Sequence, residues 1–257
     1  MTTPTASTPR VALITGGSRG LGRSMALALA AQGTDIVLTY RSNQAEAEAV
    51  VAAITALGRG AVALPLDVSK TTGFADFAAE VSRHLTGWGR NRFDFLINNA
   101  GVGVFAPFAE TTEQQFDDMV AIHLKGTFFL TQALLPLIAD GGRIVNVSSG
   151  LARFSYPGYA AYAVMKGGVE VLTRYLAAEL GPRRIAVNTI APGAIETDFG
   201  GGAVRDNADL NARIAQNTPL GRVGLPEDIG DAVAALLSDG GRWINGQRIE
   251  VAGGIHG

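Results

Sequence analysis

Cysteine is absent from this chain of 257 residues, and histidine and lysine are scarce. Without cysteine there is no disulfide, no thiolate nucleophile and no cysteine-based zinc site. The 3 histidines (His84, His123 and His256) are too few for a multi-histidine site, so we expect no bound metal. The formal net charge is -2, from 21 basic and 23 acidic residues. We therefore expect neither a nucleic-acid partner nor binding to an anionic membrane.

Long apolar runs are also missing. The longest stretches fall far short of the roughly 20 residues that a membrane span needs. Residues 1–9 are rich in Thr, Pro and Ser and lack the apolar centre of a signal peptide, so we expect a flexible tail and a cytoplasmic protein. Residues 10–257 are expected to form one globular domain, because 47% of the chain is hydrophobic and only 17% is charged.

Short apolar runs alternate with longer helical patterns along the chain. The strand candidates are Val11–Ile14, Ile36–Tyr40, Ala61–Leu66, Phe93–Asn98, Ile144–Val147, Ile185–Ile190 and Ile249–Val251. The helix candidates are Leu21–Gln32, Gln44–Leu57, Thr72–Leu85, Thr112–Ile138, Tyr159–Leu180 and Pro226–Leu237. Several runs are apolar on both faces, as strands covered by helices on each side are. The pattern predicts an α/β fold with a doubly wound, seven-stranded parallel sheet and helices on both faces.

Two segments have compositions that suggest a role outside the protein core. The stretch 198–218 contains three consecutive glycines and several Asn and Asp, which predicts a long loop. It is either a mobile substrate lid, which we favour, or a structureless insert. The helix candidate 159–180 has few charges, and a nearly all-apolar helix needs cover on its outer face. We expect a subunit interface there; a central helix of a monomer core is the alternative.

A glycine-rich turn links the first strand candidate to the first helix candidate. It reads Thr15-Gly16-Gly17-Ser18-Arg19-Gly20-Leu21-Gly22. Glycine lets the backbone approach a phosphate closely, and the helix N-terminus that follows offers free N–H groups. In the first βα turn of such a domain this favours a dinucleotide site over a plain structural turn.

The residues after the second strand candidate indicate which dinucleotide binds. The strand ends Tyr40-Arg41-Ser42, without the carboxylate that would hold a ribose 2′-hydroxyl. Arg41 stands there instead, and Arg19 lies in the glycine-rich turn. Two guanidinium groups near one ribose suit a 2′-phosphate, which favours NADPH over NADH. The alternative is that either arginine is simply solvated.

Ser149, Tyr162 and Lys166 are spaced as an acid–base site requires. Ser149 ends the fifth strand candidate, at the edge where sheets of this type bind their ligands. Tyr162 and Lys166 are four residues apart and share a helix face. A nearby ammonium lowers the pKa of a tyrosine from about 10, so that the phenol exchanges a proton with a carbonyl oxygen during hydride transfer. The neighbours Ser148 and Tyr159 lack this spacing.

Together these motifs resemble the short-chain dehydrogenase/reductase family from about Arg10 to Gly254. The matching motifs are Thr15-Gly16-x-x-x-Gly20-x-Gly22, Asn98-Asn99-Ala100-Gly101, Ser149 with Tyr162-x-x-x-Lys166, and Pro192-Gly193. The resemblance implies a Rossmann-type domain and an NAD(P)(H)-dependent oxidoreductase of carbonyls or alcohols. It also implies a homo-oligomer, either a tetramer or a dimer.

The resemblance further implies roles for individual residues. Tyr162 is expected to be the catalytic acid–base, Lys166 its pKa-lowering partner and a ligand of the nicotinamide ribose, and Ser149 the ligand of the substrate oxygen. The expected cofactor contacts are Gly16, Ser18, Arg19, Gly20, Leu21, Gly22, Arg41, Ser42, Asp67, Val68, Asn99, Ala100, Gly101, Tyr162, Lys166, Pro192, Gly193, Ile195 and Thr197.

His123 departs from the family pattern, which usually has an asparagine at this position. In the family that asparagine helps to hold a water on a proton-relay path from the lysine. An imidazole could replace the relay and add a titration near pH 6.5. Alternatively, His123 weakens turnover, marks a protein that binds cofactor without much catalysis, or is a buried histidine satisfied by the backbone.

The leading hypothesis is an NADPH-dependent reductase of a small carbonyl, a ketone or a 3-oxoacyl thioester. The subset that the chain resembles most is 3-oxoacyl-[acyl-carrier-protein] reductase. The alternatives are an alcohol or sugar dehydrogenase working oxidatively and a cofactor-binding protein with weak turnover. The segments 102–108 and 151–157 are expected to line an apolar pocket with the lid. Arg205, Arg213 and Arg222 surround the lid, where a positive patch would suit a carrier protein.

Overall fold

The computed structural model describes residues 9–256, so the predicted N-terminal tail lies outside the described part except for Pro9. Seven strands of this part form one parallel sheet in the order β3-β2-β1-β4-β5-β6-β7. They are β1 (Val11–Ile14), β2 (Asp35–Tyr40), β3 (Ala61–Pro65), β4 (Phe93–Asn98), β5 (Ile138–Val147), β6 (Ala186–Pro192) and β7 (Arg248–Val251). The predicted doubly wound sheet is confirmed.

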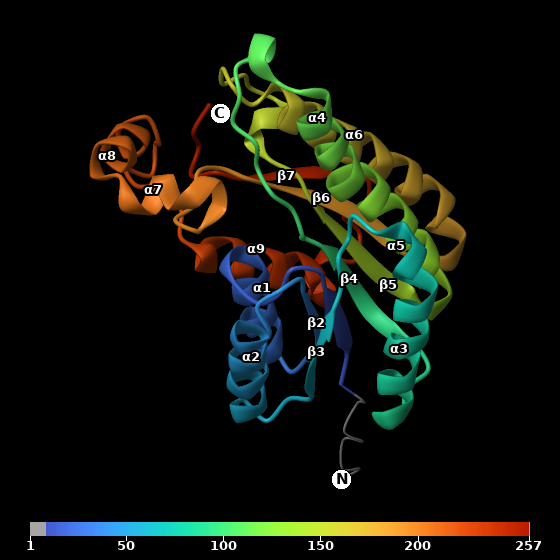
Figure 1. The fold of residues 1–257 in the computed structure, drawn as a ribbon. Helices are drawn as coiled ribbons and strands as arrows, with labels where there is room; N and C mark the ends of the chain where they lie inside the picture. Colours follow the sequence, from blue (N-terminus) through green and yellow to red (C-terminus); the bar gives the residue numbers. More distant parts are fainter. Residues whose placement is uncertain (1–8, 257) are drawn as a thin grey trace.

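Helices cover both faces of this sheet (Figure 1). One face carries α1 (Gly20–Ala31), α2 (Gln44–Ala56) and α9 (Pro226–Leu237). The other carries α3 (Phe74–Gly87), α4 (Glu113–Met119), α5 (Gly126–Leu134) and α6 (Ala160–Glu179). Two short helices, α7 (Ala203–Asp206) and α8 (Ala208–Gln216), lie outside these layers, beyond the end of β6.

The central strand β1 shows why helices must cover both faces of the sheet. All four residues of β1 are buried, and they alternate between two hydrophobic clusters. Ala12 and Ile14 pack in the cluster under α1, α2 and α9, whereas Val11 and Leu13 pack in the cluster under α3 and α5. A strand that is apolar on both faces is stable only when both faces are covered.

Three predicted boundaries were wrong. The helix predicted over Thr112–Ile138 divides into α4, a π-helical turn (Val120–Lys125) and α5, and Ile138 already belongs to β5. That strand begins earlier than the predicted Ile144 because the pairing of β4 and β5 shifts register around Gly141 and Gly142, which had the appearance of a turn. The segment 198–218 is not a plain loop, because it contains α7 and α8.

The prediction that no apolar stretch reaches membrane length also needs correction. The helical segment Glu113–Leu137 has 25 residues and is apolar enough, by length and composition, to cross a membrane. In this fold it lies against α3 and α6, yet only 28% of its most apolar window is buried. Many of its other apolar residues pack partly buried against the core, and the large ones left exposed are Phe116, Phe128 and Phe129.

Candidate active site

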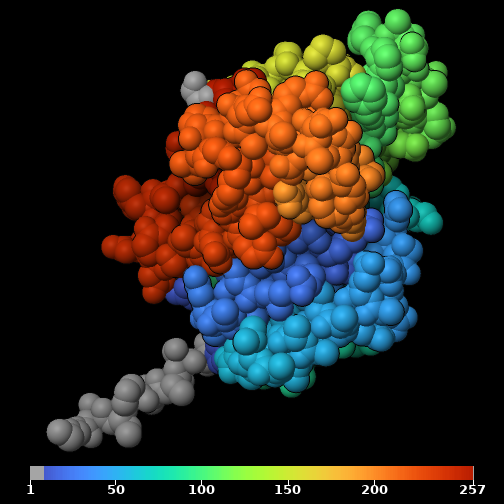
Figure 2. Space-filling model, turned by 90° about the vertical axis from the view of Figure 1, so that its left-hand side faces the viewer, coloured from blue at the N-terminus to red at the C-terminus, as the bar shows by residue number. Residues whose placement is uncertain are grey.

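A cleft of about 750 Å³ runs along the carboxyl edge of the sheet. Every catalytic and cofactor-binding residue predicted from the sequence lines it, from Gly16 and Arg41 at one end to Ser149, Tyr162 and Lys166 at the other. Figure 2 shows the segment around α7 and α8 (orange) packed above the half of the molecule that holds α1 and α2 (blue). The cleft thus combines residues from the ends of β1 to β6.

The glycine-rich turn is shaped by close backbone contacts. Gly16 has a φ of 65°, a conformation that favours glycine, and a Cβ on Gly22 would overlap the Gly16 carbonyl oxygen. Asn99 Nδ2 donates to the carbonyl oxygens of Thr15 at 2.9 Å and Gly16 at 3.1 Å. No side chain caps the N-terminus of α1, so its first N–H groups point into the cleft end without a side-chain partner. The turn therefore fits a pyrophosphate.

Both predicted arginines lie exposed at the end of the cleft that contains the glycine-rich turn. Arg19 Nη1 is 3.6 Å from Asp198 Oδ2, which links the glycine-rich turn to the segment before α7. Within residues 9–256, Arg41 forms no ion pair. Asp67 Oδ1 accepts hydrogen bonds from the backbone and hydroxyl of Ser69, and the pKa of Asp67 is lowered mainly by that hydroxyl.

The catalytic end is buried instead. Tyr162 and Lys166 are only 5% and 4% exposed. Burial raises the pKa of Tyr162 above its ordinary value, although a hydrogen bond with the Ser149 hydroxyl lowers it in part. Burial also lowers the pKa of Lys166 to about 8. Ser149, Tyr162 and Lys166 thus line the same cleft.

The predicted lowering of the Tyr162 pKa by Lys166 is not found in this structure. Lys166 Nζ donates to the carbonyl oxygen of Val147 at 2.7 Å and lies 5.5 Å from the centre of the Tyr162 ring. The ammonium is thus beneath the ring and directed at the strand, and desolvation dominates the pKa of the phenol. At neutral pH, Tyr162 holds its proton.

His123 lies in the π-helical turn and is only 1% exposed. Its Nε2 donates to the carbonyl oxygen of Val102 at 2.8 Å, and its ring stands edge-on to Tyr162 with centroids 5.4 Å apart. Burial lowers the pKa of His123 to about 3, followed by the effect of the Lys166 charge. The predicted titration near pH 6.5 is therefore wrong. His123 is a neutral imidazole that holds the loop after Asn99 beside Tyr162.

The walls of the catalytic end agree only partly with the prediction. Val102, Gly103 and Phe105 line the cleft, and Phe199 of the predicted lid packs on Gly103, with its ring centre 5.5 Å from that of Tyr162. The predicted segment 151–157 does not line the cleft. Its Phe154 packs on His256 instead, with ring centroids 4.2 Å apart, because the chain turns away after Ser149.

Two of the three arginines predicted to form a positive patch around the lid are paired with carboxylates, whereas Arg213 is exposed and has no ion pair within residues 9–256. Arg205 is paired with Asp198 and Asp206, and Arg222 with Asp228. Their charges are largely neutralised, so the feature that would have favoured a carrier protein is weakened.

Sequence reasoning missed several residues that line the cleft. They are Thr39, Tyr40, Asn43, Glu46, Leu66, Ile122, Val147 and Ser148. Most are direct neighbours of predicted residues, so the strand ends were a sufficient signal. Within residues 9–256, no group of three or more His, Asp and Glu side chains is placed to hold a metal ion.

Comparisons with known proteins agree with this geometry. The family profile described as "Enoyl-(Acyl carrier protein) reductase" matches residues 16–256. Tetrahydroxynaphthalene reductase PfmaG of Pestalotiopsis fici is 39% identical, covering 95% of this chain and 91% of its own length.

Two solved structures are similar over nearly their whole length. The angucycline C-6 ketoreductase LanV with bound NADP is 34% identical, with a TM-score of 0.90, covering 96% of this chain and 95% of its own. A short-chain dehydrogenase from Burkholderia cenocepacia, in complex with NADP, is 33% identical, with a TM-score of 0.88 and coverage of 96% and 98%. The fold, the placement of Ser149, Tyr162 and Lys166, and these relatives lead to one conclusion: the chain belongs to the short-chain dehydrogenase/reductase family of oxidoreductases.

Proposed function

We propose that this enzyme reduces a carbonyl group to an alcohol with NADPH. The observation that carries the proposal is that Ser149 and the buried Tyr162 line one end of a cleft whose other end is a phosphate cradle. Two hydroxyls at one end of a cleft can bind a single oxygen atom, and Tyr162 holds a proton for it. That is what reduction of a carbonyl requires.

The residues of the cleft fit the cofactor. The uncapped N-terminus of α1 and the glycine-rich turn would hold its pyrophosphate. Arg19 and Arg41 would hold a 2′-phosphate, because no carboxylate follows β2. Pro192, Gly193, Ile195 and Thr197 line the cleft after β6 and would frame the nicotinamide. NADP in two related structures supports the same choice.

The chain's own residues perform the proton chemistry. When bound, the reduced cofactor supplies a hydride to the carbonyl carbon. Tyr162 donates its proton to the oxygen, since burial keeps the phenol protonated at neutral pH. Ser149 holds the same oxygen in place. The Lys166 ammonium, beneath the Tyr162 ring, would hold the nicotinamide ribose.

We favour an aromatic or polycyclic ketone as the substrate. Phe105 and Phe199 stand at the walls of the catalytic end, and aromatic faces stack on planar rings. The related enzymes are a reductase of tetrahydroxynaphthalene and an angucycline ketoreductase. A 3-oxoacyl thioester remains the second substrate class, although the paired Arg205 and Arg222 offer a carrier protein little free positive charge.

A second candidate function is reduction of a carbon–carbon double bond next to a thioester carbonyl, because the matching family profile is described as an enoyl reductase. The same two hydroxyls would then bind the thioester oxygen. Oxidation of an alcohol is the reverse reaction, and it needs Tyr162 to be deprotonated first. We therefore expect the rate of oxidation to increase relative to the rate of reduction as the pH rises.

The test is an initial-rate assay of the purified protein with NADPH or NADH. Its substrates are a tetralone, acetoacetyl thioester and crotonyl thioester. Turnover of the tetralone with NADPH supports the proposal in full. Turnover of crotonyl thioester alone would replace carbonyl reduction by enoyl reduction, and equal rates with NADH would remove the role given to Arg19 and Arg41.

We place the reaction in the cytoplasm, as predicted from the sequence.

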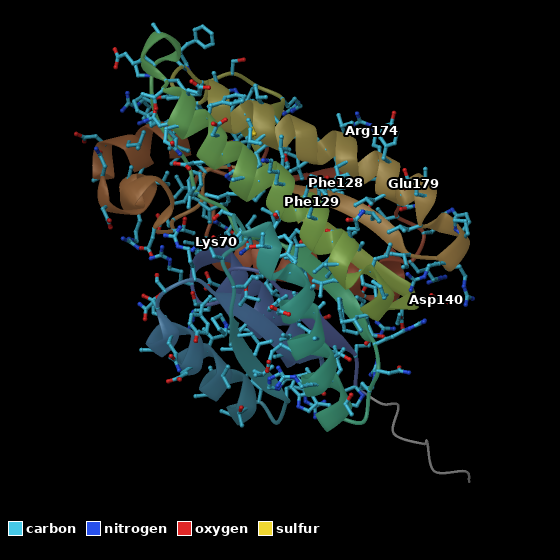
Figure 3. The ribbon with its side chains drawn as sticks, turned by 45° about the vertical axis from the view of Figure 1, so that its right-hand side comes forward. Lys70, Phe128, Phe129, Asp140, Arg174 and Glu179 are labelled. Atoms are coloured by element: carbon cyan, nitrogen blue, oxygen red, sulfur yellow. The ribbon has the colours of Figure 1, made fainter. Side chains whose placement is uncertain are left out.

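We further propose that the enzyme is a homo-oligomer, a tetramer or a dimer, joined through α5 and α6. Figure 3 shows Phe128 and Phe129 on the outer side of α5, beside the part of α6 that carries Arg174 and Glu179. These two phenylalanines are 47% and 42% exposed, and Tyr175 of α6 is 65% exposed. Such an apolar patch marks an interface. Tyr175→Glu should lower the mass measured by light scattering, whereas Leu57→Glu, on exposed α2, should not.

A further inference from the structure

Behind the catalytic serine lies a group of charged side chains that the proposed reaction does not use. Its centre is the ion pair between Glu170 of α6 and Arg248 of β7, with 2.7 Å between Oε1 and Nε. The two side chains are only 14% and 21% exposed. An ion pair so far out of water is kept only where its geometry is well satisfied, and removing one partner leaves the other charge uncompensated.

This pair holds the two residues that follow β5. The Ser148 hydroxyl donates to Glu170 Oε1 at 2.7 Å. Arg248 Nη2 donates to the backbone carbonyl oxygen of Ser149 at 3.2 Å, and Arg248 Nη1 is 3.2 Å from Glu250 Oε2. One guanidinium therefore connects two carboxylates to the backbone of the catalytic serine.

The position of Glu170 on α6 ties this group to the acid–base pair. Tyr162, Lys166 and Glu170 follow one another at intervals of four residues, so their side chains share one face of the helix. Arg248 and Glu250 are two residues apart on β7 and leave the same face of the strand. The contacts thus join the end of β5, which carries Ser149, to the helix that carries Tyr162.

The serine has local restraints as well, because Ala152 N donates to its carbonyl oxygen at 3.1 Å. Its backbone is extended, with φ -160° and ψ 151°, and its hydroxyl accepts a hydrogen bond from Leu151 N at 3.2 Å. The chain then turns at Gly150, where a Cβ would meet the ring of Phe154. Without Arg248, the carbonyl oxygen of Ser149 would lose the side chain that anchors it to the sheet.

We propose that Glu170 and Arg248 are positioning residues that fix the distance between the hydroxyls of Ser149 and Tyr162. They act through the backbone of Ser149 and through α6, and the proposal rests on the proposed carbonyl reduction. A displacement of about 1 Å at a reacting group can cost roughly 100-fold in rate, so a small loosening of this pair is enough to be measured.

The kinetic test uses Glu170→Gln, Arg248→Lys and Arg248→Met with NADPH and the best ketone of the assay above. We expect kcat to fall about 10-fold in Glu170→Gln and about 30- to 100-fold in Arg248→Met. Arg248→Lys should fall between the wild type and Arg248→Met, since lysine keeps the charge but not the fork of donors. The KM for NADPH should change less than about twofold, because the pair does not contact the cofactor cradle. The double variant Glu170→Gln/Arg248→Met should be no slower than Arg248→Met.

Arg183→Met is the matched control. Arg183 anchors the opposite end of β5, where it pairs with Asp140 at 2.8 Å and donates to the backbone carbonyls of Leu135 and Ile138. It thus has the same chemistry on the same strand, away from the cleft. We expect Arg183→Met to lower the melting temperature at least as much as Arg248→Met while kcat stays within about twofold of the wild type.

A second readout does not depend on turnover. Hydrogen exchange of the peptide that spans residues 148–153 should become faster in Glu170→Gln and Arg248→Met, but not in Arg183→Met. If the wild type reduces none of the ketones, the proposed function fails while the exchange result still decides on the positioning role. Unchanged exchange in this peptide, or a kcat that falls in Arg183→Met as it does in Arg248→Met, would overturn the inference.

Discussion

The two ends of the cleft are built in opposite ways. At the catalytic end, Tyr162, Lys166 and His123 are almost fully buried and are held by backbone carbonyls and by one another. At the other end, beside the glycine-rich turn, Arg19 and Arg41 are exposed, and the one ion pair of Arg19 spans 3.6 Å. The side chains that we propose for proton transfer are therefore fixed by packing. The side chains that we propose for binding a phosphate are exposed at the surface.

The largest effect should come from Tyr162→Phe, which removes one hydroxyl from the buried end. The variant keeps the ring that packs beside His123 and Phe199, so folding and cofactor affinity should be preserved. Turnover should fall at least about 1,000-fold because the proton donor is gone. Steady-state kinetics together with NADPH fluorescence titration measure both quantities. A variant with most of its activity left would remove Tyr162 from the mechanism.

The buried ammonium allows a sharper test of the same end. Burial lowers the pKa of Lys166 from 10.5 to about 8, so between these values the unfolded chain binds a proton that the folded chain does not. Stability then rises with pH across this window, by about 3 kcal/mol. Lys166→Met lacks this dependence. The difference in unfolding free energy between variant and wild type should therefore change by about 3 kcal/mol from pH 8 to 10.5, as measured by urea denaturation.

His123 predicts a dependence of the same sign on the acid side, where stability falls as the pH is lowered. Its pKa is lowered from 6.5 to about 3, so below pH 6.5 the unfolded chain takes up a proton that the folded chain excludes. The wild type should lose about 2 kcal/mol between pH 6.5 and 5 through this group alone. His123→Asn should lose correspondingly less, and urea denaturation at the two pH values tests it. The kcat profile of the wild type should show no step near pH 6.5; such a step, lost in His123→Asn, would restore the titrating relay.

The smallest expected effect lies at the exposed end. Arg41→Ala should raise the KM for NADPH about 10-fold, or about 1.4 kcal/mol, and leave that for NADH and the melting temperature unchanged. Arg23→Ala, an exposed arginine on α1, serves as the control. Asp198→Asn should lower the KM for NADPH, because it frees Arg19 from its ion pair. An equal rise in KM for both cofactors in Arg41→Ala would mean that Arg41 does not bind a 2′-phosphate.

Sequence patterns predicted the sheet and the cleft because both depend on local signals. Apolar runs define strands, and the carboxyl ends of parallel strands necessarily meet at one edge, so Gly16, Arg41 and Ser149 could be brought together without coordinates. The group around Arg248 could not be predicted in this way, since Arg248 and Glu170 are 78 residues apart and meet only when β7 completes the sheet. The burial of Lys166 and His123, and with it the direction of their pKa shifts, likewise depends on packing that no spacing reveals.

The π-helical turn has a consequence for how this site tolerates change in chain length. It contains His123, which reaches Val102, and it ends just before Gly126, where a Cβ would be 2.6 Å from the Val68 carbonyl oxygen. One residue of an α-helix corresponds to a rotation of about 100°. Deletion of a single residue between these two contacts would make the helix regular but turn one of them away from its partner. Insertions and deletions in this turn should therefore disrupt the site even at positions where a substitution does not.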